Sequence, residues 1–188
     1  MKLYCLSGLG VDKRAFSNIK AQGVELVHID WIKPLPDESL TSYSKRLFEV
    51  VNPEDGYNLM GVSFGGMIAS EFSKLKQPNK LFLVSTINSS SEMSTIFKLG
   101  STLRLHKLIP GFIMTKSNFI TNYLFGAYEN NDKQLLKQIL KDTDTSFLKW
   151  AINAITKWKN SEKTIGIKIH GSNDKILPLK TKANHIIN

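Results

Sequence analysis

A serine between two glycines is the feature of this chain best suited to covalent chemistry. The stretch Gly61-Val62-Ser63-Phe64-Gly65 fits the pattern G-x-S-x-G, with an apolar run before it and a helical pattern after it. The pattern alone is a weak test, because glycine and serine are common residues. The context predicts a sharp strand-to-helix turn that lifts the Ser63 hydroxyl above a sheet edge, where it could act as a nucleophile. The alternative is a tight turn with an incidental serine.

A nucleophilic serine also needs N–H groups that stabilise the negative charge developing on the attacked oxygen. The backbone N–H of Phe64, directly after the serine, is one candidate donor. The backbone N–H of Leu9 is the other, because Ser7-Gly8-Leu9-Gly10 forms a glycine-rich loop after the first apolar run. A plain glycine turn is the alternative for this loop.

Asp174 is the candidate acid of a serine, acid and base set. It closes the stretch His170-Gly171-Ser172-Asn173-Asp174, which follows an apolar run and is therefore expected at the same sheet edge as Ser63. Its expected role is to accept an imidazole N–H and fix the tautomer of the base. A turn cap is the alternative role for this carboxylate.

The base is the weakest part of the set, because the chain has only four histidines. His28 falls within an apolar run, His106 within a helical region, and His170 at a position suited to supporting the acid loop. His185 follows Asp174 in the right order, but it stands at the opening of a further strand. It is a weak candidate for the base.

Short apolar runs that alternate with helical patterns must position these residues. A helix is predicted over 65–76, and another is predicted to begin in the turn 34–40, where Asp37 or Ser39 could cap it. Strands are predicted over 2–6, 24–31, 57–62, 80–86 and 164–171. Continuous apolar strands alternating with helices indicate an α/β fold with a mostly parallel sheet flanked by helices.

The helix that is predicted to begin in the turn 34–40 is expected to bury one of its faces. Tyr43, Leu47 and Val50 have the spacing of one buried helical face.

Residues 89–160 show helical patterns and many large apolar side chains but no convincing strand. They are predicted to form a helical cap insertion between two parts of one core, 1–88 and 161–188.

Composition narrows the class of protein. Of the 188 residues, 41% are hydrophobic and 22% charged, which is typical of a globular domain. No apolar run approaches the roughly 20 residues of a membrane span, and no signal peptide is recognised, so a cytoplasmic location is expected. The single cysteine, Cys5, is expected to be a buried and inert thiol. The net charge of +9 comes mostly from scattered lysines, and without a nucleic-acid motif it indicates a solvated surface.

Taken together, these segments resemble the α/β-hydrolase fold superfamily, beginning at that fold's third strand. LSGLGVDKRAF resembles its oxyanion loop, GVSFGG its nucleophile elbow and HGSNDKILP its acid loop. The resemblance covers about 2–88 and 164–188, while the cap resembles the family in position only. It implies a serine hydrolase that acts on an ester, thioester or similar small acyl substrate through an acyl-enzyme, with no metal and no organic cofactor.

The chain departs from the family at the histidine, which the family carries on a loop after a later strand. We therefore expect that the chain stops before the general base and that this 188-residue form is severely impaired. The alternative is a non-catalytic ligand-binding protein on the same scaffold. The substrate and the oligomeric state stay open.

Overall fold

A single parallel sheet forms the centre of the molecule. The structure is a computed structural model, and it describes residues 1–93 and 117–188. Six strands follow the order β2-β1-β3-β4-β5-β6, and each neighbouring pair is parallel. The strands are β1 (Lys2–Leu6), β2 (Glu25–His28), β3 (Asn58–Val62), β4 (Lys80–Val84), β5 (Ile167–Gly171) and β6 (His185–Ile187). This arrangement confirms the predicted α/β class.

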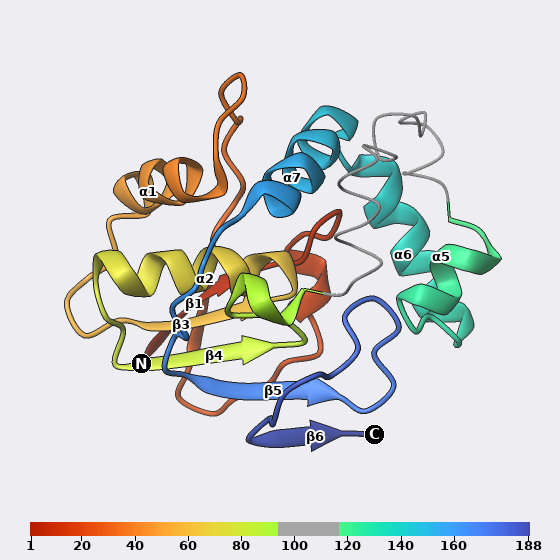
Figure 1. Ribbon diagram of the computed structural model, residues 1–188. Helices are drawn as coiled ribbons and strands as arrows, with labels where there is room; N and C mark the ends of the chain where they lie inside the picture. The colour runs from red at the N-terminus through yellow and green to blue at the C-terminus, as the bar shows by residue number, and fades with distance from the viewer. Residues whose placement is uncertain (94–116) are drawn as a thin grey trace.

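The parallel pairing brings the chemically interesting loops to one edge. Because all strands run in the same direction, the ends of β1, β3, β4 and β5 meet at the carboxyl edge of the sheet (Figure 1). Ser63 follows β3 directly, the loop around Leu9 follows β1, and Asp174 follows β5. The topology therefore positions the predicted residues on the same side of the molecule.

Three helices cover one face of the sheet: α1 (Leu40–Val51), α2 (Phe64–Leu75) and α7 (Thr145–Lys157) (Figure 1). Leu6, Leu59 and Leu83 point into this layer and are fully buried, together with Phe72 of α2. The continuous apolar character of β1, β3 and β4 follows from this burial, since a strand inside a parallel sheet is covered on both faces.

The opposite face of the sheet carries a smaller apolar cluster. Cys5 and Met60 pack there with Phe16 from the 3-10 helix η1 (Lys13–Phe16). Cys5 is 1% exposed, and burial raises the pKa of its thiol to about 12. A thiol that stays protonated is a poor nucleophile, in agreement with the inert role predicted for Cys5.

The helix α1 follows the predicted pattern except at its end. The Ser39 hydroxyl caps it by accepting a hydrogen bond from the Ser42 N–H at 3.1 Å, so Ser39 rather than Asp37 is the cap. Tyr43 and Leu47 are buried, as predicted. The prediction for Val50 is wrong, because this side chain is 66% exposed in the last turn and Val51 packs against the core instead.

The described part of the region after β4 is helical. It contains η2 (Ser90–Glu92), α5 (Phe119–Leu124), α6 (Asn130–Asp142) and α7. Phe147 and Trp158 join the main core beside the sheet, whereas Phe119, Tyr123 and Phe125 of the predicted cap are exposed. His106 lies outside the described residues, as do the apolar residues Phe97, Leu103, Leu108 and Phe112. The boundaries of the cap at 89 and 160 stay a prediction.

The final strand confirms the expectation that a further strand opens near residue 185. In β6, His185 pairs with Ile169 of β5, and the Ser172 N–H donates to the Ile187 carbonyl at 2.8 Å. Within residues 1–93 and 117–188, no helix is long and apolar enough to cross a membrane.

Candidate active site

The turn between β3 and α2 holds Ser63 in a strained backbone conformation. Its φ is 52° and its ψ is −115°, a combination that side-chain-bearing residues rarely adopt. The turn is fixed on its strand side, because the Ser63 N–H donates to the Val84 carbonyl at 2.9 Å. Strain of this kind persists only where the surrounding structure enforces it, and it concentrates at functional sites.

The two glycines of G-x-S-x-G are there because no side chain fits at either position. A Cβ atom on Gly61 would lie 2.4 Å from the Gly65 carbonyl oxygen. A Cβ atom on Gly65 would lie 2.4 Å from the carbonyl oxygens of both Leu6 and Ser7. The backbones of β1, β3 and α2 can therefore approach closely only when both residues are glycine.

Thr86, two residues after the end of β4, stabilises the same turn. It is fully buried, and its hydroxyl donates to the Ser63 carbonyl at 2.6 Å. A Cβ atom on Gly66 would lie 2.4 Å from the Thr86 methyl carbon, so Thr86 also packs against the first turn of α2. This contact was not predicted from the sequence, where Thr86 has no distinguishing pattern.

The loop after β1 lies against Ser63. A Cβ built on Gly8 would be 3.6 Å from the Ser63 Cβ. The Val11 N–H donates to the Gly8 carbonyl at 3.2 Å, and Gly10 has a φ of 72°, which identifies a tight turn with Leu9 and Gly10 at its centre. Among the described residues, no backbone carbonyl accepts the Leu9 N–H.

The second predicted donor stands at the start of α2. Phe64 is the first residue of this helix, so its N–H has no intrahelical acceptor. The positive end of the helix dipole adds to the attraction for a negative charge at this point. Phe64 itself is buried in an aromatic cluster, with its ring centroid 5.3 Å from that of Trp31 and 6.2 Å from that of Phe147. This packing, which the sequence did not reveal, holds α7 against the turn.

Asp174 lies in the loop after β5, where its carboxylate organises the turn. Its Oδ1 accepts the N–H groups of Ile176 at 2.9 Å and Leu177 at 2.8 Å. Its Oδ2 lies 3.5 Å from the Nε2 of His170. The cap role considered from the sequence is therefore present for Oδ1. The strands that precede Asp174 and Ser63 are separated by β4, so the two residues do not pair directly, and their strands lie about 10 Å apart.

None of the histidines in the described residues hydrogen-bonds the Ser63 hydroxyl. His170 is 2% exposed, and its Nε2 lies 2.7 Å from the Leu177 carbonyl, so it braces the acid loop. His28 packs its ring against Phe16 at 5.4 Å between centroids. His185 is exposed at the first position of β6, two residues before the carboxyl end of that strand.

Two cavities flank the amino-terminal half of α7. One of about 390 Å³ adjoins the loop after β1 and is lined by Gly10, Val11, Trp31, Ile32 and Phe147 among others. The indole Nε1 of Trp31 is buried there without a hydrogen-bond partner in the described structure.

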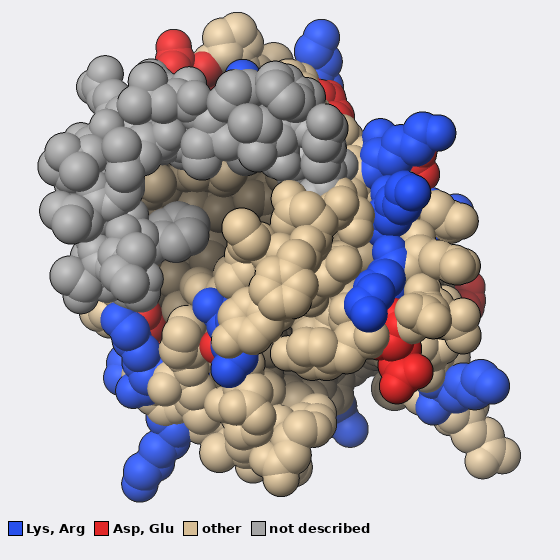
Figure 2. All heavy atoms as spheres, turned by 90° about the vertical axis from the view of Figure 1, so that its right-hand side faces the viewer, with Lys and Arg blue, Asp and Glu red and all other residues tan. Residues whose placement is uncertain are grey.

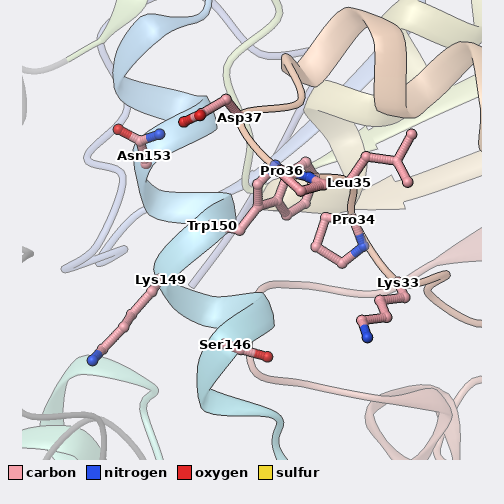
Figure 3. A pocket seen from close by; sticks show the side chains of 9 residues that line it. All are labelled: Lys33, Pro34, Leu35, Pro36, Asp37, Ser146, Lys149, Trp150 and Asn153. Atoms are coloured by element: carbon pink, nitrogen blue, oxygen red, sulfur yellow. The ribbon is translucent and has the colours of Figure 1, made fainter.

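The other cavity is larger, at about 800 Å³, and lies between α7 and the loop before α1 (Figure 3). Pro34, Leu35 and Trp150 form its apolar wall, with Lys33 and Lys149 beside it. Ser63 lines neither this cavity nor the smaller one. Within the described residues, no group of three or more histidine, cysteine or acidic side chains could hold a metal ion.

The parallel sheet with a strained serine at the turn after β3 defines the α/β-hydrolase fold. Comparison with solved structures shows the same fold. The chain is similar to an esterase from Thermogutta terrifontis, with a TM-score of 0.68 and 15% identity over 95% of this chain and 74% of that chain. A hydrolase from Pseudomonas aeruginosa gives a TM-score of 0.68 and 13% identity over 98% and 79% of the two chains.

An enol-lactonase from Burkholderia xenovorans gives a TM-score of 0.62 and 12% identity, covering 91% of this chain and 72% of that chain. No protein-family model and no curated protein matches the sequence. Identities of this size establish the fold, and the function has to be argued from the site.

Proposed function

We propose that the protein is a serine hydrolase that cleaves an ester, thioester or similar acyl bond. The observation that carries the proposal is the strained backbone of Ser63 at the start of α2, which adjoins the loop after β1. The N–H groups of Leu9 and Phe64 are the proposed oxyanion donors, because acyl transfer generates an oxyanion next to the nucleophile. The fold is also that of solved esterases.

The proposed reaction proceeds through an acyl-enzyme. The Ser63 Oγ attacks the carbonyl carbon and gives its proton to a general base, while the carbonyl electrons move onto the oxygen held by Leu9 and Phe64. The intermediate collapses, and the leaving alcohol or thiol takes the proton from the base. Water then attacks the acyl-serine in the same way, which releases the acid and restores Ser63.

Asp174 is proposed to orient the base. Its Oδ1 is committed to the backbone of its own loop, which fixes the carboxylate, and Oδ2, 3.5 Å from the His170 Nε2, is the proposed acceptor. The strands that precede Ser63 and Asp174, β3 and β5, are about two strand spacings apart, and the proposed imidazole would lie between the two residues. The family resemblance places that histidine on a loop after a later strand.

The cavity beside the loop after β1 is proposed to receive the apolar part of a small acyl substrate. Trp31, Ile32 and Phe147 supply its apolar wall, and Gly10 and Val11 connect it to the proposed oxyanion loop. No metal and no organic cofactor is part of the proposal, and a cytoplasmic location stays the expectation from the sequence.

Hydrolysis of a series of p-nitrophenyl esters tests this function in a chain extended to the end of its natural reading frame. We expect hydrolysis at enzyme-like rates, a loss of about a thousandfold or more for Ser63→Ala, and a similar loss for Asp174→Asn. Equal rates for the extended wild type and its Ser63→Ala variant would overturn the proposal.

The second candidate is a ligand-binding protein, and the cavity of about 800 Å³ favours it. Its apolar wall of Pro34, Leu35 and Trp150 suits an apolar ligand (Figure 3). This function predicts ligand binding that survives Ser63→Ala and is lost in Trp150→Ala.

A further inference from the structure

Helix α5 presents apolar side chains to the outside rather than to the core. None of its residues is buried, and Phe119 and Ile120 are 84% and 65% exposed. We define the α5 patch as the six large side chains of this helix and the turn after it: Phe119, Ile120, Tyr123, Leu124, Phe125 and Tyr128, which are 37% to 84% exposed. Large apolar side chains gathered in one exposed place mark an interaction surface.

A column of lysines runs along the neighbouring helix. Lys133, Lys137 and Lys141 are all exposed on α6 and are spaced four residues apart, so they lie along one side of that helix. The acidic residue at the end of α6, Asp142, is paired with Arg14 at 2.8 Å, which offsets its charge.

The patch and the column belong to one surface. Ala127, in the turn between α5 and α6, packs with Leu136 and Leu140 of α6, which joins the two helices. Lys175, from the loop of Asp174, adds a cation 5.8 Å from the centre of the Tyr123 ring. Figure 2, which turns this side of the molecule toward the viewer, shows an uncharged area with basic side chains on both sides of it and a few acidic side chains among them.

We propose that this surface docks on an anionic lipid surface. Aromatic and aliphatic side chains that stand next to lysines match the boundary between acyl chains and anionic headgroups, where both kinds of side chain are stabilised. The net charge of +9 adds long-range attraction to the same partner. Docking here does not depend on the chemistry of Ser63, so it is tested separately from hydrolysis.

The test is co-sedimentation of the full 188-residue chain with vesicles of phosphatidylcholine alone and vesicles containing phosphatidylglycerol. We expect binding only to the anionic vesicles, and weaker binding in high salt because salt screens the lysines. Phe119→Gln with Ile120→Gln should lower the partition coefficient by about tenfold or more. The triple variant Lys133→Gln, Lys137→Gln and Lys141→Gln should lower it by about fivefold per lysine.

Matched controls carry the same changes elsewhere. Ile165→Gln removes an apolar side chain that is 88% exposed near the opposite edge of the sheet, and binding should persist. The triple variant Lys20→Gln, Lys45→Gln and Lys80→Gln removes the same charge from exposed positions away from α6 and should bind like the wild type within about twofold. Circular dichroism and thermal melting verify that every variant is folded.

Three results would overturn the proposal. The first is a wild type that does not sediment with anionic vesicles. The second is an equal loss of vesicle binding in both triple-lysine variants, or binding that is unchanged in Phe119→Gln with Ile120→Gln. Either result would mean unspecific attraction to a polyanion. The third is a dimer in sedimentation velocity that Phe119→Gln dissociates, which would assign the α5 patch to a second copy of the chain.

Discussion

At the scale of single residues, the strand-to-helix turn at Ser63 is the feature that the sequence predicts most clearly. The two glycines of G-x-S-x-G could be predicted because their spacing reflects a local steric requirement, and the structure shows the backbone contacts that impose it. Thr86 could not be predicted, because its hydrogen bond to the Ser63 carbonyl depends on a strand pairing between residues far apart in the chain.

The glycine requirement can be tested by adding one carbon atom. Gly65→Ala places a Cβ 2.4 Å from two carbonyl oxygens, so we expect the free energy of unfolding to fall by about 1–3 kcal/mol or more. Urea denaturation measures the change. Gly171→Ala is the matched control, because its Cβ would meet no described atom closer than 3.9 Å and its cost should stay below about 1 kcal/mol. Equal costs for both variants would contradict the steric account.

The role of Thr86 is tested by two conservative changes. Thr86→Val keeps the shape but removes the hydroxyl, and it should cost about 1 kcal/mol of stability and slow the reaction of Ser63 with a fluorophosphonate. Thr86→Ser keeps the hydroxyl, so the reaction rate should stay near that of the wild type even though a methyl group is lost. A Thr86→Val variant that reacts at the wild-type rate would show that the hydrogen bond does not position Ser63.

At the scale of elements, the sequence predicted strands and helices well where burial is periodic. Five predicted apolar runs contain the five observed strands β1 to β5, and α2 begins one residue before its predicted start. The prediction for Val50 is wrong because the buried face continues from Leu47 to Val51, four residues on, which leaves Val50 exposed. The hydrogen bonds and ion pairs that lock elements together are not periodic, so they were visible only in the structure.

One such ion pair joins the loop before α1 to α1 itself. The Glu38 carboxylate, 5% exposed, accepts two hydrogen bonds from the Arg46 guanidinium, and these hold the pKa of Glu38 below its usual value. A depressed pKa in the folded state adds stability above the unfolded pKa of about 4.3, and this stability is lost as the pH falls through the folded value. We expect unfolding free energies measured from pH 6 downward to drop less steeply in Glu38→Gln. A Glu38→Gln slope equal to that of the wild type would contradict this role.

A second ion pair connects β5 with η2, in the segment after β4. The Lys168 Nζ lies 2.8 Å from the Glu92 carboxylate and 2.7 Å from the Thr181 hydroxyl, with both charged side chains at most 10% exposed. Lys168→Met leaves a buried carboxylate without its cation, so we expect a loss of about 3–5 kcal/mol in chemical denaturation. The double variant Lys168→Met with Glu92→Gln removes that charge and should recover part of the loss. A single variant as stable as the wild type would contradict the prediction.

At the scale of the whole molecule, the α/β-hydrolase fold was predictable because strand order and loop motifs point to the same answer. The site was predicted less completely. Ser63, Leu9, Phe64 and Asp174 all follow carboxyl ends of parallel strands, which the sequence pattern reveals. The outward-facing α5 patch was not foreseen, since an apolar helix is expected to cover a core, and only the packing shows that this one does not.

The central claim is that Ser63 is a covalent nucleophile, and mass spectrometry after treatment with a fluorophosphonate tests it most directly. In a chain that runs to the end of its natural reading frame, we predict one phosphonate adduct, located by peptide mapping at Ser63 and missing from Ser63→Ala. An adduct on another residue, or an unmodified Ser63 in that folded chain, would contradict the claim.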